Sequence, residues 1–144
     1  GALPASTPKE TKSDFESMIN AIESDFEPEK ITDEEHLQAQ LSIFLKAKFP
    51  NAIVEREIRT ERGDRIDVLV DGKFAFELKV PDERVKLRNL MAQLEEYKEQ
   101  YSDVCAVILD NQNLNLSDTI REYAERYQSK LGVRSIILTG KKRG

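Results

Sequence analysis

Two short segments of alternating apolar residues, separated by Asp71-Gly72, constrain the fold of this chain more than any other feature. Residues 65–70 (RIDVLV) and 73–80 (KFAFELKV) each have the pattern of a β-strand, whose side chains alternate between two faces. An Asp-Gly pair between such segments is typical of a hairpin turn. Proline cannot continue the hydrogen-bond ladder, so Pro81 ends the second strand. The sequence therefore predicts an antiparallel hairpin.

Burial determines the register of this hairpin. Even-numbered positions of both strands, from 66 onwards, carry the apolar row. The two rows reach one core only if paired residues have numbers of equal parity, and a two-residue loop does not allow this. A three-residue loop with Gly72 in the left-handed conformation does allow it. We expect this loop to pair Leu69 with Lys73 and Asp67 with Ala75.

The same parity places three charged side chains together. Asp67, Glu77 and Lys79 are expected on one side of the sheet, opposite the apolar row. Two carboxylates on rigid strands suit a hard divalent cation such as Mg²⁺ or Mn²⁺, which lowers the pKa of a bound water. A neighbouring lysine can orient that water and neutralise developing charge. The other interpretation is a solvated sheet face with cross-strand ion pairs, but helices on both faces would make bare charges costly.

Composition excludes several other chemistries. The chain has a single histidine, His36, and a single cysteine, Cys105. A Ser-His-Asp triad, a Cys-His pair, an internal disulfide and a zinc site rich in histidine or cysteine are therefore not expected. The net charge of −5 counts against a nucleic-acid binder. A bound cation reverses the local field, so the charge does not exclude one.

The remaining periodicities predict an α/β protein with a mixed central sheet and flanking helices. The other expected elements are an amphipathic helix over residues 14–26, a helix from Thr32 to Phe49, a strand over 52–59, a long helix over 83–101, a buried strand over 104–109, a helix over 118–130 and a strand over 133–138. Thr32 and Glu35 fit a capping box, and Ser117 is the expected cap of the later helix. The core order is α-β-β-β-α-β, followed by a further α-β.

Four segments divide the chain. Residues 1–12 are expected to be a flexible leader, 13–30 a helix that packs on the main domain or on a partner, 31–140 the main domain and 141–144 a basic tail. A membrane span needs about 20 apolar residues, and no run of that length is present. With no visible secretory signal, the expected location is cytoplasmic.

Asp67, nine intervening residues and then Glu77-Leu78-Lys79 resemble the bipartite signature of the PD-(D/E)XK nuclease superfamily. Residues 32–109 match the core order of that family element by element, which extends the resemblance to a restriction endonuclease-like fold. The position before Asp67 holds Ile66, where the nominal motif has proline. The resemblance implies Mg²⁺ or Mn²⁺ held by Asp67, Glu77 and the Leu78 backbone carbonyl, with Lys79 positioning the attacking water.

Two further site residues follow from the resemblance. Family members often place a glutamate of the first core helix at the metal. Asp33, Glu34 and Glu35 are the candidates here, and Glu34 is preferred because it lies nearer the apolar stripe of that helix, whereas Glu35 points away. Glu34 could also serve only the helix N-terminus. The family pattern Q-x-x-x-Y matches Gln93 to Tyr97, although Gln93 could equally be a boundary residue of an apolar stripe.

The expected function is metal-dependent hydrolysis of phosphodiester bonds in nucleic acid, with DNA favoured over RNA. The alternative is a non-catalytic module on the same fold that binds nucleic acid or protein. A third hypothesis is an effector domain of a larger defence or repair protein. A homodimer would bear on it, because a double-strand cut usually needs two active sites. The sequence leaves open the choice of endo or exo cleavage and the number of metal ions.

Overall fold

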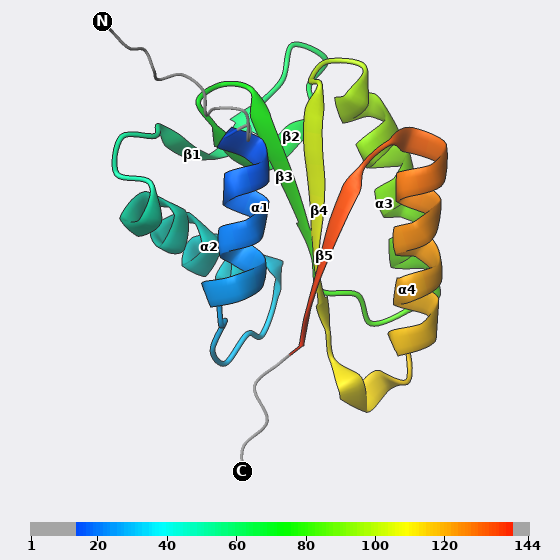
Figure 1. Cartoon of the computed structure of the whole chain (residues 1–144). Coiled ribbons are helices and arrows are strands. Elements are labelled where there is room, and N and C mark those ends of the chain that lie inside the picture. The colour runs from blue at the N-terminus through cyan, green and yellow to red at the C-terminus, as the bar shows by residue number, and fades with distance from the viewer. Residues whose placement is uncertain (1–13, 140–144) are drawn as a thin grey trace, which may run out of the picture.

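A single sheet lies between two layers of helices in the computed structural model, which describes residues 14–139 apart from the Asn113 side chain. The sheet has five strands in the order β1-β2-β3-β4-β5. Figure 1 shows α1 and α2 on one face and α3 and α4 on the other. The expected leader (1–12) and basic tail (141–144) lie outside the described residues. None of the helices within the described range combines the length and the apolar character that a membrane span requires.

The order of elements agrees with the order that the sequence predicts. The elements are α1 (Asp14–Asp25), α2 (Glu34–Lys48), β1 (Val54–Arg59), β2 (Arg65–Val70), β3 (Phe74–Lys79), α3 (Arg84–Lys98), β4 (Asp103–Asp110), a 3₁₀ turn (Gln112–Leu114), α4 (Ser117–Arg126), a π-helical turn (Tyr127–Leu131) and β5 (Arg134–Thr139). Strands β1, β2 and β3 are antiparallel neighbours, whereas β3, β4 and β5 run parallel. The mixed sheet and its α-β-β-β-α-β order with a further α-β are therefore confirmed.

The hairpin register differs from the expected one by two residues. Val70 pairs with Phe74 and Leu69 with Ala75, so the predicted pairing of Leu69 with Lys73 is wrong. A three-residue loop with Gly72 in the left-handed conformation (φ 68°) is present as expected, but it spans residues 71–73 and not 70–72. Parity alone permits several registers two residues apart, and the position of the loop selects one of them. Extending the observed register places Asp67 opposite Glu77 rather than Ala75.

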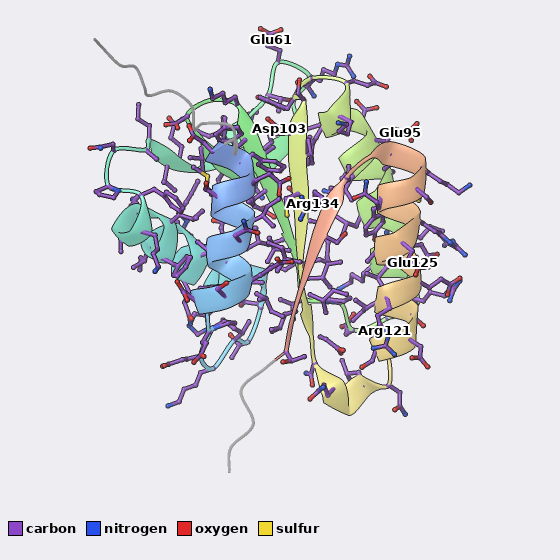
Figure 2. All side chains as sticks on the ribbon, in the orientation of Figure 1. Glu61, Glu95, Asp103, Arg121, Glu125 and Arg134 are labelled. Carbon is purple, nitrogen blue, oxygen red and sulfur yellow. The ribbon has the colours of Figure 1, made fainter. Side chains whose placement is uncertain are left out.

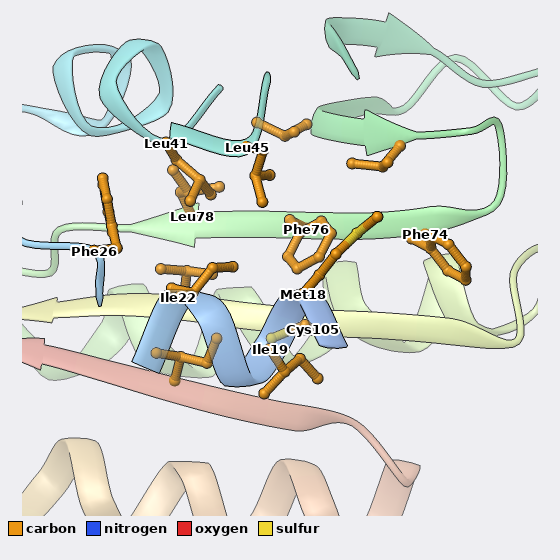
Figure 3. Packing of buried hydrophobic residues seen from close by; sticks show 14 of the residues in the cluster. Met18, Ile19, Ile22, Phe26, Leu41, Leu45, Phe74, Phe76, Leu78 and Cys105 are labelled. Atoms are coloured by element: carbon orange, nitrogen blue, oxygen red, sulfur yellow. The ribbon is translucent and has the colours of Figure 1, made fainter. Parts of the chain in front are cut away.

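Helices α1 and α2 cover one face of the sheet. Their apolar stripes bury Met18, Ile22 and Leu41 against the even-numbered residues of β3, among them Phe76 and Leu78 (Figure 3). The sequence left open whether this helix packs on the main domain or on a partner. Helix α1 packs on the main domain. Its Phe15 ring stacks on Phe74, with centroids 5.6 Å apart.

Helices α3 and α4 cover the opposite face. Their buried residues, with Leu90 and Tyr97 among them, pack on Ala75 and on the even-numbered residues of β4. Charged side chains, including Arg121 and Glu125 of α4 (Figure 2), lie exposed on the outside of this layer. A sheet buried on both faces explains the continuous apolar run of β4.

Strand β2 changes face at Asp67. Ile66 packs with the α3–α4 layer, whereas Val68 packs with α1 and α2, so the expected single apolar row is wrong at Ile66. The β1–β2 ladder joins positions 56–68 and 58–66 and skips the pair between them, Glu57 and Asp67. Glu57 has a φ of 54°, and this left-handed residue breaks the alternation of both strands.

Two predicted helix caps are wrong. Helix α2 begins at Glu34, and the Asp33 side chain accepts a hydrogen bond from the His36 N–H at 2.9 Å. Asp33 is therefore the N-cap in place of Thr32, because it stands directly before the first helical residue. Ser117 lies inside the first turn of α4, where its Oγ donates to Asp110 instead of capping the helix.

Candidate functional site

Asp67 lies where strands β2 and β3 stop pairing. The ladder between the two strands reaches Val68 and Phe76. Beyond this point the Leu78 backbone N–H of β3 has a side-chain acceptor on β2 in place of a backbone carbonyl. It donates to Asp67 Oδ2 at 2.8 Å. The other oxygen, Oδ1, accepts from Nε2 of Gln38 on α2 at 3.3 Å. These two contacts fix the half-buried carboxylate between the sheet and α2.

Glu77 is the most deeply buried charged residue of the site. It lies in the middle of three hydrogen-bonded strands and is only 3% exposed. Its Oε1 atom is buried and has no hydrogen-bond partner. Tyr97 of α3 packs close by and donates its hydroxyl to the Arg65 carbonyl at 2.8 Å. A buried carboxylate oxygen without a donor is costly unless a cation, a proton or a water meets it.

Lys79 and Glu34 close the other side of the site. Lys79 is the last residue of β3, and its Nζ lies 3.7 Å from Glu34 Oε2. The same Glu34 oxygen accepts the Val80 backbone N–H at 3.3 Å. The Lys79 side chain is 14% exposed, and that of Glu34 is 39% exposed. The first residue of α2 is therefore tied to the end of the strand that carries Glu77.

The site concentrates negative charge in a poorly solvated place. Burial raises the pKa of Glu77 well above its ordinary value, and the neighbouring Asp67 carboxylate raises it further. Burial also raises the pKa of Asp67, although the hydrogen bond from Leu78 and the charge of Lys79 oppose this. One lysine offsets the two carboxylates only in part, so the site is suited to further positive charge.

Two residues that the sequence did not single out support Asp67, Gln38 directly and Arg56 through Gln38. Gln38 is 4% exposed, and its Oε1 accepts the Arg56 Nε–H at 2.9 Å while its Nε2 donates to Asp67. Gln38 follows Glu34 by four residues, which puts both on one side of the helix. That spacing could have identified Gln38 as a site residue from the sequence. Nothing in the sequence indicated Arg56, which β1 brings close through its pairing with β2.

Gln93 is not linked to the other predicted site residues. It lies half-buried on α3, and no hydrogen bond between described residues joins it to Asp67, Glu77 or Lys79. Its role therefore stays a prediction. A surface pocket lined by Met18, Phe49 and Asp71, among others, lies at the opposite end of α2 and contains none of the site residues.

The donor set fits one hard divalent cation. Asp67 and Glu77 supply two carboxylates, and the free Glu77 Oε1 is a buried acceptor without a partner. Mg²⁺ typically takes one or two protein carboxylates and keeps several waters. Within residues 14–139 no three Asp, Glu, His or Cys side chains converge closely enough to form a metal cage by themselves. Glu34 as a third ligand, like the Leu78 carbonyl, stays a prediction, because the contacts found for Glu34 are with Lys79 and Val80.

Comparison with known proteins assigns this chain to no family. No protein-family model matches this chain, and no curated protein matches it.

Proposed function

We propose that this protein is a metal-dependent nuclease of the PD-(D/E)XK type that hydrolyses phosphodiester bonds in nucleic acid, with DNA favoured. The observation that carries the proposal is the buried Glu77 next to the half-buried Asp67 and Lys79, with no hydrogen-bond partner for Glu77 Oε1. A purely structural carboxylate at a position so deeply buried would be expected to have a donor for each oxygen. A divalent cation would satisfy both carboxylates at once.

The arrangement of the elements supports the same proposal. Helix α2, the three antiparallel strands, α3 and the parallel β4 follow the core order of the restriction endonuclease-like fold. The bipartite motif lies on β2 and β3, and extending the observed register by one position would set its two acidic residues opposite each other. Glu57, which faces Asp67 across the β1–β2 ladder, has the left-handed φ of 54°. Strained backbone of this kind is concentrated at functional sites.

Each residue has a distinct role in the proposed reaction. Asp67 and Glu77 would hold Mg²⁺ or Mn²⁺, joined by the Leu78 carbonyl. The bound cation supplies charge neutralisation on the phosphate and a more acidic water. Lys79, held at the edge of the site by Glu34, would orient the attacking water and neutralise charge that develops on the phosphate oxygens. Gln38 keeps Asp67 aimed at the site.

A second candidate is a non-catalytic module on the same fold that binds nucleic acid or protein. Two observations favour it. The net charge of −5 disfavours nucleic acid and so favours a module that binds protein, and the described part of the chain has no cluster of three metal-ligating side chains. An active nuclease would still need only two carboxylates together with backbone and water ligands, so we place the catalytic function first.

Calorimetric titration with Mn²⁺, together with cleavage of mixed DNA and RNA substrates, tests the proposal. Wild type is expected to bind Mn²⁺ and to cleave. Asp67→Asn, which keeps the size of the side chain, is expected to lose both activities. Asp103→Asn is the matched control, because Asp103 is a strand carboxylate at the other end of β3 and β4. It should behave as wild type.

The outcomes separate the two candidates. Mn²⁺ binding and cleavage that are lost together in Asp67→Asn but kept in Asp103→Asn support the nuclease. Nucleic-acid binding without Mn²⁺ binding or cleavage by the wild type would reject it and leave the binding module. Cleavage by Asp67→Asn at the wild-type rate would show that the reaction does not use this site.

A further inference from the structure

Arg56 is held in a fixed orientation next to the carboxylate site. Its Nε–H donates to Gln38 Oε1 at 2.9 Å, and the other end of the same amide donates to Asp67 Oδ1 at 3.3 Å. Gln38 is 4% exposed, so this amide is a buried and well-positioned support. A single side-chain amide therefore separates the Arg56 guanidinium from the proposed metal-binding carboxylate.

The outer part of this guanidinium is available to a ligand. A guanidinium has five N–H donors in one plane, and Gln38 occupies the one on Nε. No carboxylate among the described residues forms an ion pair with Arg56, which is exposed on β1. Some other arginines of the described residues are neutralised, as Arg62 is by Glu96 and Glu99, and Arg134 by Glu16. Arg56 thus combines an anchored side chain with unpaired charge.

We infer that Arg56 binds a backbone phosphate of the nucleic-acid substrate, next to the phosphate that reacts at Asp67 and Glu77. The inference rests on the proposed function for the choice of nucleic acid. Planar N–H groups of arginine match two phosphate oxygens at once. A protein with a net charge of −5 repels nucleic acid in general, so a positioned cation at the site itself is needed to bring the strand near. Gln38 acts as the positioning residue for both Arg56 and Asp67.

The test is binding of a fluorescently labelled single-stranded DNA oligonucleotide, measured by anisotropy at several salt concentrations in the presence of EDTA. Each phosphate contact contributes about −0.7 to the slope of log affinity against log salt for a single strand. Arg56→Gln removes the charge and keeps an amide that can reach Gln38, and it is expected to reduce the slope by about that amount. Arg56→Lys keeps the charge and should retain most of the slope.

The matched control is Arg59→Gln. Arg59 lies on the same strand, and its Nη1 donates to the Gly63 carbonyl rather than to the site. Its slope is expected to equal that of wild type. Thermal melting of each variant verifies folding. In cleavage assays with Mn²⁺, Arg56→Gln should raise KM several-fold more than it lowers kcat, since a contact to a phosphate away from the reacting bond acts mainly on binding.

The possible results are distinct. A reduced slope for Arg56→Gln with an unchanged slope for Arg59→Gln supports the inference. Equal slopes for Arg56→Gln and wild type overturn it, and leave the nuclease proposal standing if wild type cleaves. An Arg56-dependent slope without cleavage keeps the phosphate contact of Arg56 and rejects the nuclease. If inorganic phosphate competes as strongly as the oligonucleotide, or if wild type binds no oligonucleotide, the inference falls.

Discussion

The carboxylate of Asp67 accepts the backbone N–H of Leu78 at 2.8 Å. Leu78 stands between Glu77 and Lys79 on β3, so this hydrogen bond fixes the spacing between the two halves of the motif. It also gives Asp67 a structural role in addition to the chemical role that we propose. The two roles can be separated by the choice of substitution.

Asp67→Ala is expected to lower the free energy of unfolding by roughly 1–3 kcal/mol, because it leaves the Leu78 N–H without its acceptor. Asp67→Asn keeps a carbonyl oxygen for that N–H and should cost clearly less. Both substitutions should abolish Mn²⁺ binding. Urea unfolding in the absence of metal measures the first effect, and calorimetry the second. Equal losses of stability for the two variants would show that the Leu78 hydrogen bond contributes little.

Glu77→Gln is expected to stabilise the metal-free protein at about pH 8 by on the order of 1 kcal/mol, because it removes a buried charge that has an unpartnered oxygen. The pKa of Glu77 is raised in the fold by burial and by Asp67. The folded state therefore favours the protonated form of Glu77. Protonated Glu77 contributes fully to stability below the unfolded pKa of about 4.3, and this contribution is lost as pH rises through the folded pKa.

The difference between Glu77→Gln and wild type should accordingly vanish near pH 4, where Glu77 is protonated. Urea unfolding at the two pH values measures this. Glu55→Gln, an exposed carboxylate on β1, is the control and should have no effect at either pH. A stabilisation that is the same at both pH values would contradict the explanation from charge burial.

Glu57→Gly is expected to leave stability nearly unchanged, whereas Glu55→Gly should cost about 1 kcal/mol. Both residues are exposed on β1, but only Glu57 of this pair has a positive φ, of 54°. Glycine adopts that conformation without steric cost, which offsets its greater loss of backbone entropy. Chemical denaturation of the two variants measures the difference. A loss of similar size in both would show that residue 57 is not left-handed in solution.

The protein is expected to lose stability above about pH 10. Burial raises the pKa of Tyr97 and of Tyr127, whose hydroxyls donate to the Arg65 and Leu87 carbonyls. The folded state favours the neutral phenols, so their contribution is complete below the unfolded pKa and is lost as pH rises above it. Unfolding midpoints measured across this range should fall in wild type.

The double variant Tyr97→Phe, Tyr127→Phe tests the origin of that loss. It should be less stable than wild type at neutral pH, because two hydrogen bonds are gone, and its stability should decline less in alkali. Tyr101→Phe, which removes a half-buried hydroxyl, is the control and should follow wild type. If the stability of the double variant falls as steeply with rising pH as that of wild type, ionisation of these two tyrosines is not the cause.

Local sequence patterns predicted the elements and their order well. Alternation in residues 65–70 and 73–80 predicted that Asp67, Glu77 and Lys79 lie near one another, and the charges of Asp67 and Lys79 do act on Glu77. Parity does not distinguish registers two residues apart, so the pairing of Leu69 was wrong. The choice of Asp33 over Thr32 as N-cap depends on a helix start that local preferences define only to within a residue or two.

Contacts between segments that are distant along the chain could not be predicted from the sequence. Ile66 changes face because Glu57, on another strand, is left-handed, and a glutamate gives no local sign of that conformation. The Arg56–Gln38–Asp67 chain joins three elements whose side chains meet only after β1 has paired with β2 and α2 has packed on the sheet. These residues have no fixed spacing along the chain, so no motif could reveal them.

Helix α1 and strand β5 are joined by an ion pair between Glu16 and Arg134, marked on β5 in Figure 2, although 118 positions separate the two residues. On the ribosome, α1 emerges long before its partner strand. Its buried stripe therefore remains partly uncovered throughout synthesis of the intervening chain, which is the period of greatest risk of self-association for a nascent polypeptide. Contacts this distant in sequence also slow folding. We therefore expect α1 and β5 to pack late in folding. Their packing depends on when β5 leaves the ribosome and not on how fast the β2–β3 hairpin forms.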